Sequence, residues 1–203
     1  MAWEVRKLGD VLKIERGGSP RPIEKYITNS PNGINWIKIS DATASDKYIY
    51  ETKEKITQEG LNKTRLVYEG DFILSNSMSF GRPYIMKTTG CIHDGWLVLR
   101  QPQKKIFETE FLYYLLSSPY LFQQFDLLAA GSTVRNLNIA LASSVDVPIP
   151  PLAEQKRIVA ILDETFSAIS TAKENAEKNL KNAKELFESY LNNIFEKKGK
   201  DWE

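Results

Sequence analysis

The sequence has little of the chemistry that catalytic and metal-binding proteins use. It contains one cysteine, Cys91, and one histidine, His93, in 203 residues. A single cysteine excludes an internal disulfide and any zinc site built from several cysteines. The glycine patterns GxxxxGK[ST], GxGxxG and GxSxG are all absent. We therefore expect no metal site, no cofactor and no active site, and interpret Cys91 as a buried thiol and His93 as a polar loop contact.

Long apolar runs and a strong net charge are also absent. No run approaches the roughly 20 apolar residues that cross a membrane, and the first ten residues, MAWEVRKLGD, lack the apolar core of a secretion signal. We expect a cytoplasmic protein without membrane contact. The net charge is +1, and residues 1–150 carry 18 Lys and Arg against 16 Asp and Glu. Bulk charge alone does not indicate nucleic-acid binding, so a DNA-binding face would need local clusters of charge.

The run DVPIPPLAEQKRIVAILD, at residues 146–163, predicts a stiff joint between two parts of the chain. Its three prolines favour an extended backbone, because each ring fixes φ and disfavours helix at the preceding residue. Helix-compatible residues begin at Leu152, and Gln155 in the first turn is of a type that accepts from exposed N–H groups. We expect a globular domain over residues 1–150 and a helix over residues 151–198.

The globular part mixes strand and helix signals. A helix is predicted over 108–128, with a break at Pro119. Pro83–Met86 and Ile92 are interpreted as strands on either side of a turn at Thr88-Thr89-Gly90. The other predicted strands are Trp36–Ile39, Phe72–Leu74, Trp96–Leu99 and Val145–Ile149. The expected fold class is α/β (α+β), an irregular mixed domain followed by a long coiled-coil helix.

Apolar or small residues recur along 152–197 at intervals of three and four, which is a coiled-coil rhythm with one stutter. A single helix cannot bury such a stripe against itself, so we expect a partner helix. A helix folded back on its own domain is the alternative. The residues expected to form the dimer contact are Ile158, Leu162, Ile169, Ala176, Leu180, Phe187 and Ile194.

Three loops combine arginine with small polar residues, at 16–21, 75–82 and 131–138. Arginine, asparagine, serine and threonine donate to phosphates and read base edges, so the loops are candidates for DNA contact. Their alternative interpretation is ordinary turns whose side chains satisfy their own backbone. The candidate DNA-binding residues are Arg16, Ser19, Arg21, Ser77, Ser79, Arg82, Ser132, Arg135, Asn136 and Asn138.

The order of these segments resembles the specificity subunits of type I restriction-modification systems, over nearly the whole chain. The joint and the Gly-Ser-Thr segment carry most of the resemblance, and the remaining segments support it by their order. The matching segments are WEVRKLGD at 3–10, GSP at 18–20, WIKISD at 36–41, EGDFILS at 69–75, GST through NLN at 131–138, and PPLAEQ at 150–155.

The resemblance implies a non-catalytic target recognition domain joined to a conserved spacer helix. Such a subunit reads half of a bipartite target in double-stranded DNA. It docks methyltransferase (modification) subunits, which carry S-adenosylmethionine, and a translocating restriction subunit with nuclease activity. Members usually hold two recognition domains and two helices, whereas this chain has one of each. We therefore expect a homodimer through the helix that reads a palindromic split site.

Residues 199–203 are interpreted as a tail or the start of a second repeat that does not continue, because Trp202-Glu203 repeats Trp3-Glu4. Two other classes of function stay open on the residues alone. The chain could be a coiled-coil adaptor with a protein-binding domain, or an enzyme whose site is built from scattered residues.

Overall fold

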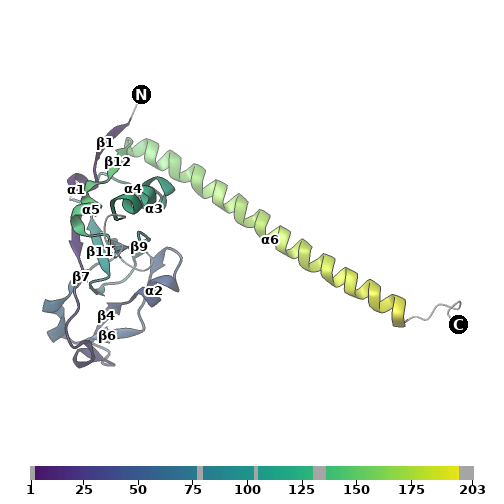
Figure 1. The fold of residues 1–203 in the computed structure, drawn as a ribbon, viewed down its shortest axis with the longest axis horizontal. Helices are drawn as coiled ribbons and strands as arrows, with labels where there is room; N and C mark the ends of the chain where they lie inside the picture. The colour runs from purple at the N-terminus through teal and green to yellow at the C-terminus, as the bar shows by residue number, and fades with distance from the viewer. Residues whose placement is uncertain (1–2, 77–79, 103–104, 130–135, 197–203) are drawn as a thin grey trace. The chain divides into compact units, whose positions relative to one another are not determined.

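A computed structural model describes residues 3–76, 80–102, 105–129 and 136–196 of the chain. The chain divides into two units, residues 1–156 and residues 157–203. The first unit is a mixed α/β domain, and the second continues the long helix α6 (Leu152–Glu196). The expected fold class, a mixed domain followed by a long helix, is confirmed (Figure 1).

The described residues of the first unit form three sheets. The smallest pairs the two ends of the domain, since β1 (Glu4–Lys7) runs antiparallel to β12 (Asp146–Ile149). One five-stranded sheet has the order β3-β6-β4-β10-β7 and the other β2-β11-β8-β9-β5. The strands of the first are β3 (Ile27–Thr28), β6 (Glu54–Ile56), β4 (Ile34–Ile37), β10 (Gly90–Ile92) and β7 (Arg65–Val67). Those of the second are β2 (Lys13–Arg16), β11 (Trp96–Arg100), β8 (Phe72–Ser75), β9 (Pro83–Met86) and β5 (Tyr48–Ile49).

Short helices complete the domain. The predicted helix with a break is present as two helices that meet at the proline, where the ring cannot continue the preceding hydrogen-bond ladder. The helices are α1 (Leu8–Val11), α2 (Ile39–Thr43), α3 (Thr109–Ser117), α4 (Pro119–Ala129) and α5 (Ile139–Ser144), with 3₁₀ turns η1 (Ile23–Lys25) and η2 (Gln58–Lys63).

The core lies on the central strands of the second five-stranded sheet. All four residues of β8 and all four of β9 are buried, which explains why these strands are nearly continuous apolar runs. Trp96 is fully buried and packs edge-on against Tyr84 at 5.8 Å between ring centroids. A smaller cluster of Trp36, Ile56 and Cys91 lies under the other sheet, so the thiol is buried as expected.

The strands predicted at Pro83–Met86 and Ile92 are present as β9 and β10, but they do not pair with each other, because β9 pairs with β8 and β5 whereas β10 pairs with β4 and β7. The turn between them therefore passes from one sheet to the other. Ile39 is not in a strand, because β4 ends at Ile37 and Ile39 opens α2.

The proline joint is extended and the helix begins at Leu152, as predicted. Gln155 has a different role from the one expected. Its side chain is fully buried, its Oε1 accepts from the Glu108 amide at 2.7 Å, and its Nε2 donates to the carbonyls of Ile106 and Pro150 at 3.0 and 2.8 Å. This amide ties the first turn of α6 to the segment before α3, so the turn belongs with the first unit.

Beyond its first turns, α6 presents exposed apolar side chains along its described length. They include Ile161, Phe166, Ile169, Leu180, Phe187 and Tyr190, all about half-exposed or more. Buried apolar surface is what stabilises most helices in proteins. Among the described residues, no helix combines the length and the apolar character that a membrane crossing needs.

Candidate nucleic-acid interface

The first predicted loop follows β2 and lies against the turn His93–Gly95, which joins β10 to β11. The amide of Gly17 donates to the Trp96 carbonyl at 2.9 Å. A Cβ atom at Gly17 would lie 2.0 Å from the His93 carbonyl oxygen. Only glycine allows this close approach of two backbones. The loop therefore starts from a fixed point on the turn.

Asp94 gathers the polar side chains of this loop. Ser19 Oγ donates to its carboxylate at 2.7 Å, Arg21 Nη2 lies 3.7 Å from the other carboxylate oxygen, and Arg16 Nε donates to its backbone carbonyl at 3.0 Å. The hydrogen bond from Ser19, together with the charge of the Arg16 guanidinium, holds the pKa of the Asp94 carboxyl below its ordinary value. Three predicted DNA-contact residues thus meet at Asp94, Ser19 and Arg21 at its carboxylate and Arg16 at its backbone carbonyl.

His93 shapes the same turn from the inside. Its Nδ1 accepts a hydrogen bond from the Gly95 amide at 2.9 Å, and its ring lies 6.1 Å from those of Trp36 and Trp96. Burial lowers the pKa of His93, and the nearby Lys38 ammonium lowers it further, while Asp94 acts in the opposite direction. The imidazole is therefore neutral at pH 7. Its role is the polar loop contact that the sequence predicts.

Asn76 connects the other two loops to this turn. It is 1% exposed, its backbone amide donates to the Gly95 carbonyl at 3.0 Å, and its side-chain Nδ2 donates to the Asp94 carbonyl at 2.9 Å. Its own carbonyl accepts from the Leu137 amide at 2.9 Å. The first loop and Asn76 therefore contact His93–Gly95 directly, and Leu137 is joined to this turn through Asn76, although up to about 120 positions of sequence separate these segments.

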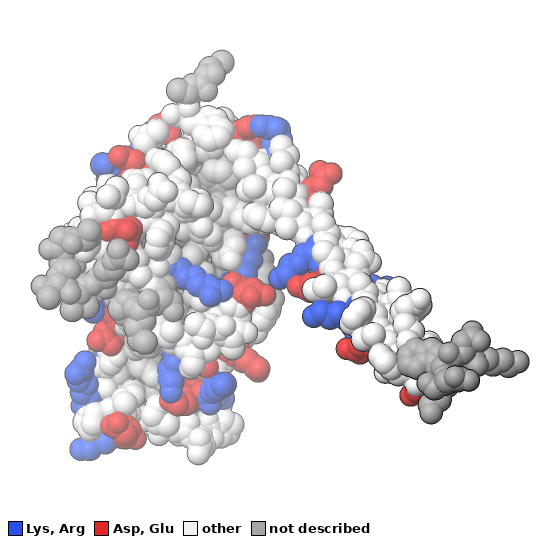
Figure 2. Space-filling view, turned by 45° about the vertical axis from the view of Figure 1, so that its right-hand side comes forward, with Lys and Arg blue, Asp and Glu red and all other residues white. Residues whose placement is uncertain are grey.

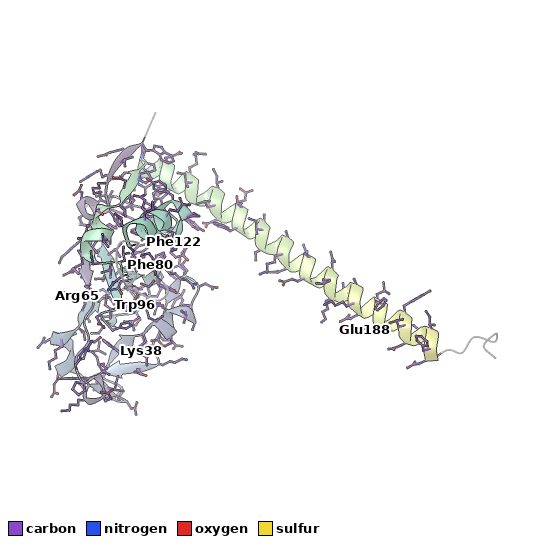
Figure 3. The ribbon with its side chains drawn as sticks, in the orientation of Figure 1. Lys38, Arg65, Phe80, Trp96, Phe122 and Glu188 are labelled. Atoms are coloured by element: carbon purple, nitrogen blue, oxygen red, sulfur yellow. The ribbon has the colours of Figure 1, made fainter. Side chains whose placement is uncertain are left out.

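Arg82 closes the second loop. Its backbone amide donates to Ser75 Oγ at 3.0 Å, and Gly81, at φ +74°, donates to the Ser75 carbonyl at 2.8 Å. Beside it, Phe80 packs edge-on against Phe122 of α4 at 6.3 Å between centroids (Figure 3). The loop end is thereby fixed to a helix, while the Arg82 residue stays exposed.

The remaining predicted residues are placed as follows. Asn136 is half-buried, and Asn138 is exposed at the start of α5, where its side chain caps the helix by accepting from the Leu141 amide at 2.9 Å. The cap uses the amide oxygen and leaves the amide N–H groups for other contacts. Ser77, Ser79, Ser132 and Arg135 lie outside the described residues.

The sequence did not identify a cleft of about 840 Å³ beside the first loop. The residues that line it include Ser19, Arg21, Trp36, Lys38 and His93. Lys38 Nζ lies 2.6 Å from Glu54 Oε1 across neighbouring strands, and both side chains are more than a third exposed. No local pattern marks these residues, because the pairing of β4 with β6 brings them together.

Other charges near the loops are already paired. Glu15 contacts Arg100 at 2.7 Å, Arg65 at 3.2 Å and Lys13 at 3.2 Å, and although burial opposes it, these cations hold the pKa of Glu15 below its ordinary value. On the face shown in Figure 2, basic and acidic side chains are intermixed. By contrast, the side chain of Arg21 is 83% exposed, with one guanidinium nitrogen 3.7 Å from the Asp94 carboxylate, so the guanidinium can also reach an anion in solution.

The arrangement supplies hydrogen-bond donors and guanidinium groups on fixed loops, which suits recognition of a polar polymer. His93 Nδ1 already accepts a hydrogen bond from the Gly95 amide, so this ring nitrogen is engaged within the turn. The described residues also contain no group of three or more His, Cys, Asp or Glu side chains placed to hold a metal ion.

Comparison with known proteins gives a consistent result. The MjaVIII specificity subunit of a type I restriction enzyme from Methanocaldococcus jannaschii is 27% identical over 93% of this chain and 45% of its own length. This chain spans less than half the length of this relative and of two other specificity subunits from the same organism.

Two solved structures share the fold. One comes from a study of complex assembly and conformational transition of the type I restriction-modification system, with a TM-score of 0.74 and 24% identity over 96% of this chain and 46% of that one. The other is the HsdS subunit from Thermoanaerobacter tengcongensis, with a TM-score of 0.65 and 24% identity over 85% of this chain and 39% of that one.

These curated relatives are specificity subunits of type I restriction enzymes. The family described as the type I restriction modification DNA specificity domain matches residues 1–182. The chain belongs to this family of type I restriction-modification specificity domains.

Proposed function

We propose that this chain is a non-catalytic recognition component of a type I restriction-modification enzyme and reads one half of a bipartite target in double-stranded DNA. The convergence of three polar loops on the His93–Gly95 turn carries this proposal. Separate loops become one surface only through that turn. A duplex contacts such a surface over several neighbouring nucleotides, which three adjoining loops can cover.

The described side chains divide by the contact each can make. Arg21 and Arg82 are exposed cations on fixed loops, so they suit phosphates or guanine edges. Ser19, Asn136 and Asn138 suit base edges or sugar and phosphate oxygens. Arg16 is anchored to Asp94 and acts at the base of the first loop. The sequence adds Ser77, Ser79, Ser132 and Arg135 to this surface.

The partners follow from the family. Two copies of the chain join through α6 and read a palindromic split site, and the helices set the gap. Methyltransferase subunits bring S-adenosylmethionine, and a restriction subunit completes the enzyme. The chain itself binds neither metal nor cofactor in this proposal. The exposed apolar side chains of α6 support pairing, because a helix of this length needs a partner to bury them.

DNA binding is tested by fluorescence anisotropy on the complex with its modification subunit. Arg21→Ala and Arg82→Ala should each weaken binding and reduce the slope of log affinity against log salt by about 0.9 if they contact phosphate. Arg6→Ala is the matched control, because Arg6 lies on β1 and bonds only the Asp10 carbonyl among the described residues. Equal affinity and slope for the wild type and both loop variants would contradict the proposed surface.

The target is tested by mapping methylated sites in a host that expresses the chain with its modification subunit. A symmetric split motif supports two identical recognition domains. An asymmetric motif contradicts the dimer and leaves DNA recognition intact. No measurable affinity for DNA, together with salt-insensitive binding of a protein partner, would instead favour the adaptor function.

A further inference from the structure

The cleft beside the first loop contains an ion pair that lies outside the three predicted loops. Lys38 follows the end of β4 (Figure 3), and Glu54 is the first residue of β6. Their side chains lie on one face of the sheet, because Trp36 pairs with Glu54 and Lys38 is two residues beyond Trp36. The Lys38 ammonium lies 2.6 Å from the Glu54 carboxylate. The cleft therefore offers a hydrogen-bond donor and an acceptor side by side.

A buried carboxylate holds the backbone beside both members of this pair. Asp41 is 6% exposed, and its Oδ2 accepts from the Lys38 amide at 2.9 Å while its Oδ1 accepts from the Lys53 amide at 3.3 Å. Thr52 Oγ1 donates to the Glu54 carbonyl at 2.8 Å. These bonds do not use the side chains of Lys38 and Glu54, so they fix the backbone whatever side chains stand there. A rigid support of this kind favours precise recognition.

The signs of the two charges indicate which part of DNA the pair suits. A lysine that contacts phosphate acts through its positive charge, whereas the Glu54 carboxylate repels phosphate. The pair also adds little to stability, because both side chains are more than a third exposed. The edge of a base pair differs from phosphate, since it presents acceptors and a donor together. The pair is therefore better matched to a base edge than to the DNA backbone.

A G·C pair complements Lys38 and Glu54 in the major groove. Guanine presents two adjacent acceptors, N7 and O6, which lysine contacts, and the paired cytosine presents its N4 amino donor, which glutamate contacts. An A·T pair has one acceptor on each side of its amino group and a methyl group beyond, so an ammonium there would meet a single acceptor. The match places Lys38 on the guanine and Glu54 on the cytosine.

The cleft also connects this ion pair to the first loop. Ser19 and Arg21 line it together with Lys38 and Glu54. A duplex whose phosphate contacts Arg21 would therefore have its bases next to the pair. We infer that Lys38 and Glu54 are specificity-determining residues that read one G·C pair of the half-site. The inference rests on the proposed function, which supplies the duplex, and it adds the residues and the base pair.

Selection of bound sequences from a randomised duplex library tests the inference on the complex with its modification subunit. The wild type should select a motif with a G·C pair at one position. Glu54→Gln should lower the preference at that position by about 5- to 150-fold, because an amide can donate as well as accept. The other positions should stay unchanged.

Asp146→Asn is the matched control. Asp146 pairs with Lys7 across β12 and β1 at 2.8 Å, and both side chains are about half-exposed. Figure 1 shows these two strands at the opposite end of the domain from β4 and β6. The control removes the carboxylate of a cross-strand ion pair in the same way, and it should select the wild-type motif.

A charge-swapped variant, Lys38→Glu with Glu54→Lys, separates base reading from structural support. The variant retains an ion pair and the backbone bonds to Asp41. A pair that only supports the fold would therefore leave the motif unchanged. Base reading predicts that the preferred pair changes from G·C to C·G at the same position, because the donor and the acceptor exchange places.

Relaxed preference at one G·C position in Glu54→Gln, with reversal in the swapped variant, supports the inference. An unchanged motif in either variant overturns it and leaves DNA recognition intact, and so does a change at an A·T position. An equal loss of preference at every position means that the pair supports the fold, which also overturns it. If the wild type selects no motif, the proposed function fails and the inference fails with it.

Discussion

The side-chain amide of Asn76 donates a 2.9 Å hydrogen bond to the backbone carbonyl of Asp94, and this bond joins loops that the sequence places far apart. The Asp94 carboxylate accepts a hydrogen bond from Ser19 of the first loop, and the backbone carbonyl of Asn76 accepts one from the Leu137 amide of the third. The candidate surface therefore depends on a buried hydrogen bond between Asn76 and Asp94, and removing that bond should affect more than one of the three loops.

Asn76→Ala should destabilise the domain by about 1–2 kcal/mol, because it removes one buried hydrogen bond and leaves a carbonyl without that donor. DNA affinity should also fall, because the Asn76 segment, whose backbone carbonyl accepts from Leu137, loses its side-chain bond to the turn that holds the first loop. Urea denaturation and anisotropy measure the two effects. Asn35→Ala is the control. The Asn35 side chain donates a 2.8 Å hydrogen bond to Thr88 Oγ1, and neither residue belongs to the three loops. Equal DNA affinity for Asn76→Ala and the wild type would refute the bridge.

Asp94→Asn should raise affinity for non-specific DNA and lower discrimination between target and non-target sequences. The substitution removes a negative charge beside Arg16, Ser19 and Arg21, while an amide oxygen can still accept from Ser19. The salt slope should steepen by up to about 0.9 if one further phosphate contact forms. Asp10→Asn makes the same charge change at α1 and should have little effect. A uniform loss of binding to all sequences would show that Asp94 only supports the fold.

Stability should fall as the pH drops below about 6.5, the ordinary pKa of histidine. Burial lowers the pKa of His93 in the folded state, so the unfolded chain binds the proton first. The stability is therefore complete above the unfolded pKa and is lost as the pH falls through the window between the two values.

The chain has one histidine, so untagged protein gives a single imidazole titration by NMR together with urea midpoints from pH 5 to 7.5. His93→Gln should flatten the dependence above pH 5. A measured pKa above 6.5 would reverse the sign and contradict the argument.

Gln155→Ala should cost about 2–3 kcal/mol of unfolding free energy, because the Glu108 amide and the carbonyls of Ile106 and Pro150 each lose a partner in a buried place. Gln124→Ala is the control. It removes two bonds to Asp146 from a half-buried side chain and should cost less, about 1 kcal/mol. Thermal or urea unfolding measures the loss of unfolding free energy in both variants. Equal losses would mean that burial of the Gln155 amide does not make its hydrogen bonds more stabilising than those of Gln124.

The sequence predicted element boundaries well where a proline sets them. The prolines before Leu152 predicted where α6 begins, Pro119 marked the break between α3 and α4, and β9 was placed from Pro83 to Met86. Proline acts through its own ring and its direct neighbours, so its effect is visible without the fold.

Sheet order and the centre of the candidate surface needed the structure. The strands β9 and β10 are close in sequence and belong to different sheets, because pairing partners are chosen by distant segments. Asp94 looked like a neighbour of His93, yet its hydrogen-bond partner Ser19 is 75 residues away. The short helices α1 and α5 were also missed, because four and six residues carry too little periodicity to detect.

The pairing of Glu4 with Ile149 has an evolutionary consequence. The chain enters and leaves the domain on two paired strands, β1 and β12, so both ends of the segment between them lie at the same place. A foreign segment with the same two edge strands can replace it without moving the helix start. Recombination within β1 and β12 would therefore exchange one recognition domain, and with it one DNA target, for another in a single step. The long helix and the partners that bind it would stay unchanged.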